Sequence, residues 1–297
     1  MTMPTTTIAR AVALARRAVP PVLLPLLVAV RTRLAWSRAG IRADARAQMR
    51  FLLEHTRPDA GLDTDIDADI ERAARAYVRY QVRRAELRWH PRLVTRMRVE
   101  GLEHLTGARD RGHGVLLNFM HHGHYDGAFP SFARHGVRCQ MVVYPYMLEP
   151  DAPLWLQQHV ALACIGGGRP VSTAVGSDGM LDLLRAGEVV AIASDVPGRT
   201  PLRFVGRDVL GSFGAARLAT DAGAPVVVMT SEEDDRGAYI RVHPPLEPAD
   251  FASPRELLEA MLAIHESVQT RWPEATDLPL SRWGLVGATS PAREAAS

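Results

Sequence analysis

Three histidines and an aspartate lie within the six positions from His121 to Asp126, in the segment NFMHHGHYDGAF (residues 118–129). Imidazole and carboxylate groups can bind a metal ion, and an imidazole held by a carboxylate can act as a general base. The segment directly follows the apolar run GVLLNF, which predicts a buried strand. Because α/β proteins build their sites at the carboxyl ends of strands, this position favours a functional site.

One spacing in this segment suits a metal. His122, His124 and Asp126 form H-x-H-x-D, which resembles the start of the zinc signature of metallo-β-lactamases. That signature continues with a histidine directly after the aspartate, whereas Gly127 occupies the position here. A zinc-dependent hydrolase that uses these three residues is therefore kept as the alternative interpretation. The interpretation that we favour involves no metal.

The other spacing joins His121 to Asp126 as H-x-x-x-x-D. Five residues along one helix rotate a side chain by about 500°, so the two side chains would point apart on a continuous helix. They can meet if His121 lies on the turn after the strand and Asp126 on the first helical turn, with Gly123 allowing the bend. The carboxylate would then hold one imidazole nitrogen while the other takes a proton from a bound hydroxyl.

The elements around this segment alternate between strand-like and helix-like patterns. We therefore expect an α/β fold with a mostly parallel central sheet flanked by helices. The predicted strands are GVLLNF, CQMVVYP, GEVVAIASD, PVVVMTSE and AYIRVHP. The predicted helices include SDGMLDLLRAG, GSFGAARLATDAG and SPRELLEAMLAIHESVQTRW, the last with Ser253 as its N-cap.

The N-terminal region is basic and contains an apolar stretch, AVPPVLLPLLVAV (residues 18–30). It is shorter than the ~20 residues that a spanning helix needs, three prolines interrupt it, and arginines flank it. This pattern favours shallow contact with an anionic membrane surface, as a peripheral protein at the cytoplasmic face of the cell membrane. The simpler alternative is that the stretch packs against the rest of the protein.

Composition and pattern divide the 297 residues into four parts. A hydrophobic content of 47% with 23% charged residues is typical of a folded protein. We expect no nucleic-acid partner. The predicted parts are a membrane-associating segment (1–48), a helical lead-in (49–96), an α/β domain (97–285) and a disordered tail (286–297).

With these patterns in place, the chain resembles a known family. H-x-x-x-x-D is the first motif of the glycerolipid acyltransferase superfamily, and EGLEHLTGARDRGHGVLLNFMHHGHYD resembles its branch of lipid A late acyltransferases and phosphatidylinositol mannoside acyltransferases. The resemblance continues through LLRAGEVVAIASDVPGRTPLRFVGRDVLGSFGAARLATDAGAPVVV to WPEATDLPLSRW, over residues 97–284.

The resemblance assigns roles to individual residues. It makes His121 the general base and Asp126 its orienting partner. The block ASDVPG occupies the place of the family's later acidic motif, so Asp195 and Gly198 are candidate site residues; an acid that only ends a strand is an equal interpretation of Asp195. The block lacks the F-P-E-G-T-R form of glycerol-phosphate acyltransferases, which argues against glycerol phosphate as acceptor.

Arginines complete the candidate set. Arg169, after IGGG, matches an arginine of the lipid A branch. Arg199 and Arg203, with Arg207, suit a phosphate-bearing donor such as coenzyme A or an acidic carrier protein, although they could also form a solvated face.

The expected activity is acyl transfer. A fatty acyl chain would pass from an acyl thioester, either acyl-coenzyme A or acyl carrier protein, to a hydroxyl of a lipid or glycolipid, with no cofactor. The expected partners are this donor, the lipid acceptor and an anionic membrane surface. Besides the zinc hydrolase, a noncatalytic membrane-surface module is a further alternative.

Overall fold

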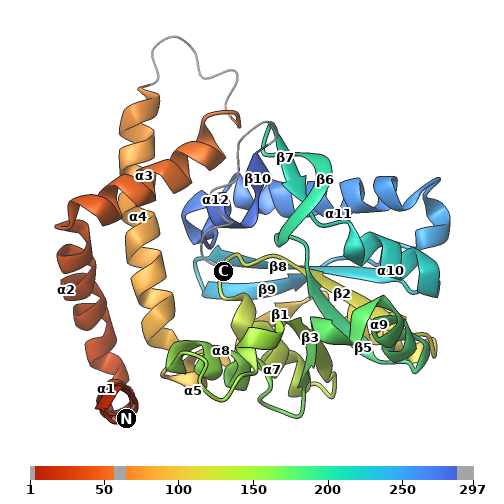
Figure 1. Ribbon diagram of the computed structural model, residues 1–297, viewed down its shortest axis with the longest axis horizontal. Coiled ribbons are helices and arrows are strands. Elements are labelled where there is room, and N and C mark those ends of the chain that lie inside the picture. The colour runs from red at the N-terminus through yellow and green to blue at the C-terminus, as the bar shows by residue number, and fades with distance from the viewer. Residues whose placement is uncertain (1–3, 57–64, 286–297) are drawn as a thin grey trace.

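The computed structural model describes residues 4–56 and 65–285, and its centre is a seven-stranded sheet in the order β1-β9-β8-β2-β5-β3-β4 (Figure 1). Neighbours from β8 to β4 pair in parallel, whereas β9 is antiparallel to β8 and parallel to β1. The protein therefore has the expected α/β fold with a mostly parallel sheet. The strands are β1 (Arg98–Glu100), β2 (Val115–Phe119), β3 (Cys139–Val143), β4 (Arg169–Ser172), β5 (Val189–Ala193), β8 (Val226–Asp234) and β9 (Gly237–Val242).

Helices cover both faces of the sheet, and the central strand β2 is buried throughout. Leu116 packs in a cluster with α9 (Gly176–Arg185), α10 (Gly214–Ala222) and α11 (Pro254–Gln269). Leu117 and Phe119 point to the opposite face, where they pack with α6 (Leu102–Asp110), α7 (Ala128–Ala133) and α8 (Leu154–Ala163). Alternation along a strand sends successive side chains to opposite faces, which explains why apolar residues occupy both.

The five predicted strands correspond to β2, β3, β5, β8 and β9, and the three quoted helices to α9, α10 and α11. The Ser253 side chain caps α11 by accepting from the N–H of Glu256. A second, antiparallel sheet was not predicted; it consists of β6 (Pro197–Phe204), β7 (Arg207–Gly211) and β10 (Gly284–Leu285). Its edge strand β6 contains two prolines, which interrupt a strand pattern in the sequence but are tolerated on an edge strand.

The N-terminal helices form one side of the molecule (Figure 1). They are α1 (Pro4–Ala18), η1 (Pro21–Leu23), α2 (Leu24–Trp36), α3 (Ala39–Leu53) and α4 (Ile66–Leu87), followed by α5 (Pro91–Val94). Residues of α3 and α4, such as Met49 and Tyr77, join the core cluster of α9–α11. Helix α3 runs across the predicted boundary at residues 48 and 49, so the chain has no structural break there. The predicted disordered tail, 286–297, lies outside the described residues.

In the described part of the chain, no single helix is both long and apolar enough to cross a membrane. Residues Ala11–Ala18 and Pro21–Trp36 meet that criterion of length and composition only as a pair, and the pair is bent by 93°.

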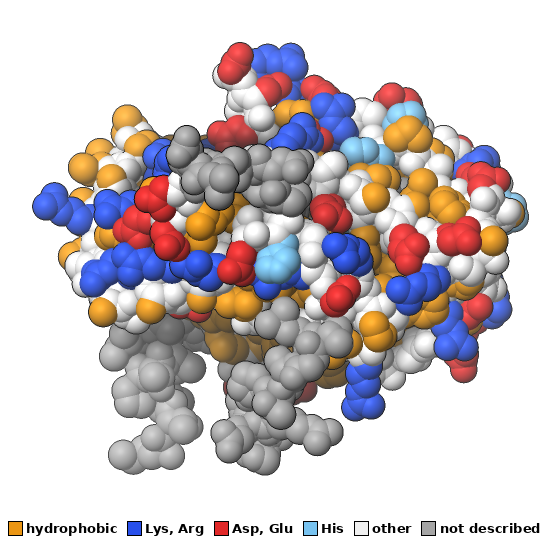
Figure 2. Space-filling view, turned by 90° about the horizontal axis from the view of Figure 1, so that it is seen from above, with side chains coloured by type: hydrophobic (Ala, Val, Ile, Leu, Met, Phe, Trp, Pro, Cys, Tyr) orange, Lys and Arg blue, Asp and Glu red, His pale blue; other side chains and the backbone are white. Residues whose placement is uncertain are grey.

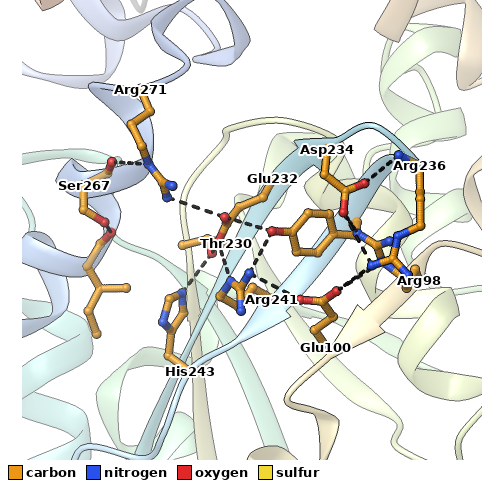
Figure 3. Close-up of polar contacts among 12 residues, drawn as sticks. Arg98, Glu100, Thr230, Glu232, Asp234, Arg236, Arg241, His243, Ser267 and Arg271 are labelled. Atoms are coloured by element: carbon orange, nitrogen blue, oxygen red, sulfur yellow. Dashed lines mark hydrogen bonds and ion pairs between the residues drawn. The ribbon is translucent and has the colours of Figure 1, made fainter.

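A network of charged side chains joins the strands β1, β8 and β9 (Figure 3). The carboxylate of Glu232 accepts from Arg241 Nε at 2.8 Å and from the Tyr239 hydroxyl at 3.1 Å. Arg241 also lies 3.3 Å from Glu100. Strands β1 and β9 run opposite to the other five strands. The network therefore links these two strands to β8, at the edge of the parallel part of the sheet.

Candidate active site

His121 and Asp195 form a pair at the carboxyl edge of the sheet. His121 follows β2 and Asp195 follows β5, and these adjacent parallel strands align Phe119 with Ala193, two positions earlier in each case. One carboxylate oxygen of Asp195, Oδ1, lies 2.8 Å from Nδ1 of His121, and the other accepts from the backbone N–H of His121 at 2.9 Å. Because a carboxylate only accepts, Nδ1 carries the proton and Nε2 keeps its lone pair.

The charges around this pair favour an ionised aspartate and a neutral histidine. Burial alone would raise the pKa of Asp195, but attraction to His121 and Arg282 outweighs it and holds that pKa below its ordinary value. Burial lowers the pKa of His121, and Asp195 only partly offsets this effect. An imidazole that is neutral near pH 7 and oriented by a carboxylate can accept a proton from a hydroxyl.

His121 lines a pocket of about 290 Å³ that is mainly apolar. This volume is at the lower end of the range of small-molecule sites. The pocket is therefore suited to an apolar ligand next to the imidazole. Its apolar wall comes from β3, β5, α9 and α10 and includes Met141, Val143, Met180, Ile192, Ala215 and Leu218.

Asp126 does not make the expected contact with His121. The chain turns at Gly123, which has a φ of +64°, and enters η2 (Tyr125–Gly127), where Asp126 is buried. Its Oδ2 lies 3.1 Å from Arg88 Nε, 3.9 Å from Arg84 Nε and 3.6 Å from His159 Nδ1. The carboxylate that holds His121 is instead that of Asp195.

The environment of Asp126 makes it a buried counter-ion. Burial opposes ionisation, but His159, Arg84 and Arg88 together hold the pKa of Asp126 well below its ordinary value. Tyr125 lies among these groups: its ring contacts the rings of His121 and His159, with centroids at 4.8 and 5.7 Å, and the Arg84 guanidinium lies 4.5 Å from its centre. Asp126 therefore supports the wall of the pocket behind Tyr125.

The other two histidines of the segment are buried neutral side chains. His122 Nε2 lies 2.9 Å from the carbonyl oxygen of Trp272, so this nitrogen donates and has no lone pair for a metal. The ring of His124 packs against Tyr80, with centroids 5.3 Å apart. Burial lowers the pKa of both imidazoles to about 4. Within residues 4–56 and 65–285, no three His, Cys, Asp or Glu side chains are grouped so that they could hold a metal ion.

The structure separates the remaining candidates. Arg169 begins β4 opposite Gln140 of β3, and its side chain, which is 69% exposed, lies near Glu188 at the start of β5. It is therefore at the amino edge of the sheet, away from His121. Gly198 lies so close to Gly211 that an added Cβ would come within 2.0 Å of the carbonyl oxygen there. Its role is to let β6 approach β7 closely.

Arg199 and Arg203 are exposed on the same strand, β6. This strand begins at Pro197, which lines the pocket of His121. Arg199 is thus two positions from the pocket wall, and Arg203 lies further along the strand.

Two further charged residues at the site, Asp277 and Arg282, were not predicted from the sequence. The Arg282 guanidinium donates to the Asp277 carboxylate at 2.8 Å and lies 3.6 Å from Asp195. The backbone N–H of Asp277 donates to the carbonyl of His121 at 2.8 Å. Both residues belong to the block WPEATDLPLSRW, which resembles the acyltransferase family. A charged pair within that block is the feature of the sequence that could have identified them as site residues.

Comparison with known proteins gives a match to a family profile and structural matches, one of which is described below. The sequence profile described as "bacterial lipid A biosynthesis acyltransferase" matches residues 5–276. The crystal structure of the 1-acyl-sn-glycerophosphate acyltransferase from Thermotoga maritima is 12% identical, with 83% of this chain and 97% of that chain covered and a TM-score of 0.40. No curated protein sequence matches the chain.

Proposed function

Because the chain belongs to the bacterial lipid A biosynthesis acyltransferase family and is an acyltransferase of this type, we propose that it transfers a fatty acyl chain from an acyl thioester to a hydroxyl of a lipid or glycolipid. The observation that carries the proposal is the His121–Asp195 pair beside an apolar pocket. A neutral imidazole supplies the base for the hydroxyl, and the pocket suits the hydrocarbon chain.

The proposed reaction needs only proton transfers and one displacement. His121 Nε2 takes the proton of the acceptor hydroxyl as its oxygen attacks the thioester carbonyl and forms a tetrahedral intermediate. The intermediate collapses to the ester, the carbon–sulfur bond breaks, and the thiolate takes the proton from the imidazolium. Asp195 keeps Nδ1 protonated and stabilises the imidazolium between the two steps.

The donor is acyl-coenzyme A or acyl carrier protein in this proposal. Arg199 is exposed two positions from Pro197 of the pocket wall, where it can contact the phosphates of coenzyme A or an acidic carrier protein. Arg203, exposed further along β6, could contact a more distant part of such a donor. Arg169 is not part of this donor site because it lies at the opposite edge of the sheet.

We place the protein peripherally on the cytoplasmic face of an anionic membrane, through its N-terminal helices. Four apolar side chains on these helices are 59–81% exposed: Leu14 of α1, Val22 of η1, and Leu26 and Leu34 of α2. Figure 2 shows hydrophobic side chains at this end of the molecule with arginines between them. Apolar side chains flanked by cations suit shallow insertion into an anionic surface.

The proposal is tested by measuring acyl transfer with the purified protein. Labelled acyl-coenzyme A and labelled acyl carrier protein would each be supplied with lipid acceptors, in the presence and absence of a metal chelator. We expect an acyl ester product that forms at the same rate in chelator. Release of free fatty acid without transfer, abolished by chelation and restored by zinc, would support the hydrolase instead.

A further inference from the structure

We propose that a basic pocket where α1, α4 and α8 meet binds the phosphate group of an anionic membrane lipid. The pocket has a volume of about 150 Å³ and is lined by Arg16, Ala85, Arg88, Trp89 and Trp155. It is separate from the pocket of His121, and the inference rests on the proposed membrane association but not on acyl transfer.

The segments around the pocket are distant in sequence but joined by hydrogen bonds. Arg17 of α1 donates to the side-chain oxygen of Gln158 in α8, and Gln158 donates to the backbone carbonyl of Arg88 at the end of α4. Figure 1 shows α1, the end of α4, α5 and α8 gathered at one corner of the molecule. The pocket is thus a built feature of the fold with three elements as its walls.

Positive charge exceeds negative charge around the pocket. Arg16 donates two hydrogen bonds to the buried carboxylate of Glu86, at 2.7 and 3.2 Å, and Arg31 pairs with the same carboxylate. Two cations therefore share one anion, and the pKa of Arg31 is lowered by burial and then by repulsion from Arg16. A phosphate group in the pocket would relieve this repulsion, because guanidinium groups bind phosphate through paired hydrogen bonds.

The binding groups are held in place before a ligand arrives. The Arg16 and Arg17 guanidinium groups lie 5.4 and 5.8 Å from the centre of the Trp89 ring. Arg88 is fixed by its Nε bond to Asp126, at 3.1 Å. Stacking and ion pairing restrict these long side chains, so binding a phosphate would cost less side-chain entropy.

A helix end adds to the positive potential. Helix α8 begins at Leu154 without a side-chain N-cap bond and without an acid in its first turn. Trp155, in that first turn, lines the pocket. No acid within the first turn of α8 therefore offsets the partial positive charge of the helix start, which favours an anion.

The surroundings of the pocket indicate that the phosphate belongs to a lipid. Trp155 is 54% exposed, and Val12 and Leu14 of α1 and Leu93 of α5 are 46–65% exposed. Tryptophan is enriched at the level of lipid headgroups, where an indole contacts both apolar and polar groups. A basic pocket that contains an exposed tryptophan, on a surface whose helices also carry exposed apolar side chains, matches the boundary between headgroups and acyl chains.

The experiment is vesicle binding by the full chain, with phosphatidylcholine vesicles and with vesicles that also contain phosphatidylglycerol. The pocket variant is Arg16→Gln/Arg88→Gln, and the matched control is Arg33→Gln/Arg38→Gln, which removes two cations from α2 and its connection to α3. We expect the parent to prefer the anionic vesicles and the pocket variant to lose roughly tenfold or more of this affinity, with a much smaller loss for the control.

Each other outcome is decisive. Equal losses of vesicle affinity in the two variants would show general charge attraction and would contradict the proposed lipid site. Equal binding of both vesicle types by the parent would contradict it as well. A parent that binds neither would overturn the membrane proposal itself. If the pocket variant bound anionic vesicles like the parent but lost binding of inorganic phosphate in solution, the site would serve a soluble phosphate and not a lipid.

A second variant tests the same pocket without breaking buried ion pairs. It is needed because the arginine substitutions remove partners of Glu86 and Asp126 and could impair folding. Trp155→Ser alters an exposed side chain, and it should weaken binding to anionic vesicles severalfold, whereas Trp155→Phe should restore much of it. Near-ultraviolet circular dichroism would confirm the fold of each variant. Binding by Trp155→Ser that equalled the parent's would contradict the proposed pocket.

Discussion

The Asp195 carboxylate contacts His121 twice, at its imidazole Nδ1 and at its backbone N–H. The first contact sets the tautomer of the imidazole, and the second fixes the turn on which the histidine lies. Arg282 lies beside the same carboxylate and, together with His121, holds the pKa of Asp195 below its ordinary value. The proposed base is thus oriented by a residue 74 positions away in the chain.

Asp195→Asn should therefore impair the chemical step without preventing folding. An amide can still accept from the backbone N–H of His121, but it no longer stabilises the imidazolium and can favour the wrong tautomer. We expect kcat to fall by roughly 10²–10⁴-fold with little change in KM for the donor. Steady-state kinetics would check this, and a variant that changed KM alone would contradict an orienting role.

Asp126→Asn should affect stability instead. Asp126 is buried beside Arg84 and Arg88, so its loss removes the ion-pair partner of Arg88 and leaves Arg84 paired with Asp277. We expect the free energy of unfolding to fall by about 3–5 kcal/mol. Chemical denaturation would measure the change.

The matched control for this variant is Asp182→Asn, which removes the carboxylate of an exposed ion pair on α9. It should cost at most about 1 kcal/mol. Equal effects of the two substitutions would contradict the role assigned to Asp126.

The different roles of Asp126 and Asp195 show which parts of the site could be predicted from the sequence. Alternating strands and helices predicted the α/β fold, and the position after GVLLNF correctly predicted that His121 lies at the carboxyl edge of the sheet. The H-x-x-x-x-D spacing, with an expected turn at Gly123, and the resemblance to the acyltransferase superfamily then paired His121 with Asp126. The actual partner, Asp195, depends on β2 lying next to β5, and that lateral order follows from packing of the whole sheet and not from local pattern.

The substrate-binding candidates illustrate the same limit. Arg169 follows a glycine-rich segment and matched an arginine of the related branch, yet it begins its strand and so lies at the edge opposite to His121. The direction and register of a strand decide which edge a residue reaches. Asp277 and Arg282 come from the C-terminal block and reach the site only because that segment folds back onto the turn at His121.

Acid should destabilise the protein because several histidines are buried in the neutral form. Burial lowers the pKa of His122, His124 and His159 to about 4 and that of His265 to about 3. Below about pH 6.5 the unfolded chain binds protons at these imidazoles while the folded chain does not, so the free energy of unfolding falls as pH falls. We expect a loss of at least ~2 kcal/mol between about pH 7.5 and about pH 5.

His265→Gln tests the source of this acid sensitivity. The Nε2 of His265 lies 2.9 Å from Asn118 Oδ1, and a glutamine amide can keep a hydrogen bond there without taking up a proton. The dependence of unfolding on pH should be shallower in this variant than in the parent. An unchanged slope would show that the buried imidazole does not contribute.

The apolar pocket should limit the length of the acyl chain. Gly214 lines the pocket at the start of α10, and a Cβ added there would meet only Ser212 Oγ, at 3.6 Å. A Cβ is therefore accommodated at this position, so Gly214→Phe adds a ring at the pocket wall and Gly214→Ala serves as its control. We expect Gly214→Phe to shift the preference toward shorter acyl chains, measured in a competition among donors of different length. A preference equal to that of Gly214→Ala would indicate that the chain binds elsewhere.

The most direct test of the central claim, that His121 is the general base, compares acyl transfer by His121→Ala with transfer by His122→Ala and His124→Ala. Initial rates would be measured with one acyl thioester donor on variants shown to be folded. The account predicts that His121→Ala loses about 10²–10⁴-fold or more in rate, and that the other two substitutions, which alter buried neutral side chains, lose much less. Transfer by His121→Ala at the parent rate would contradict it.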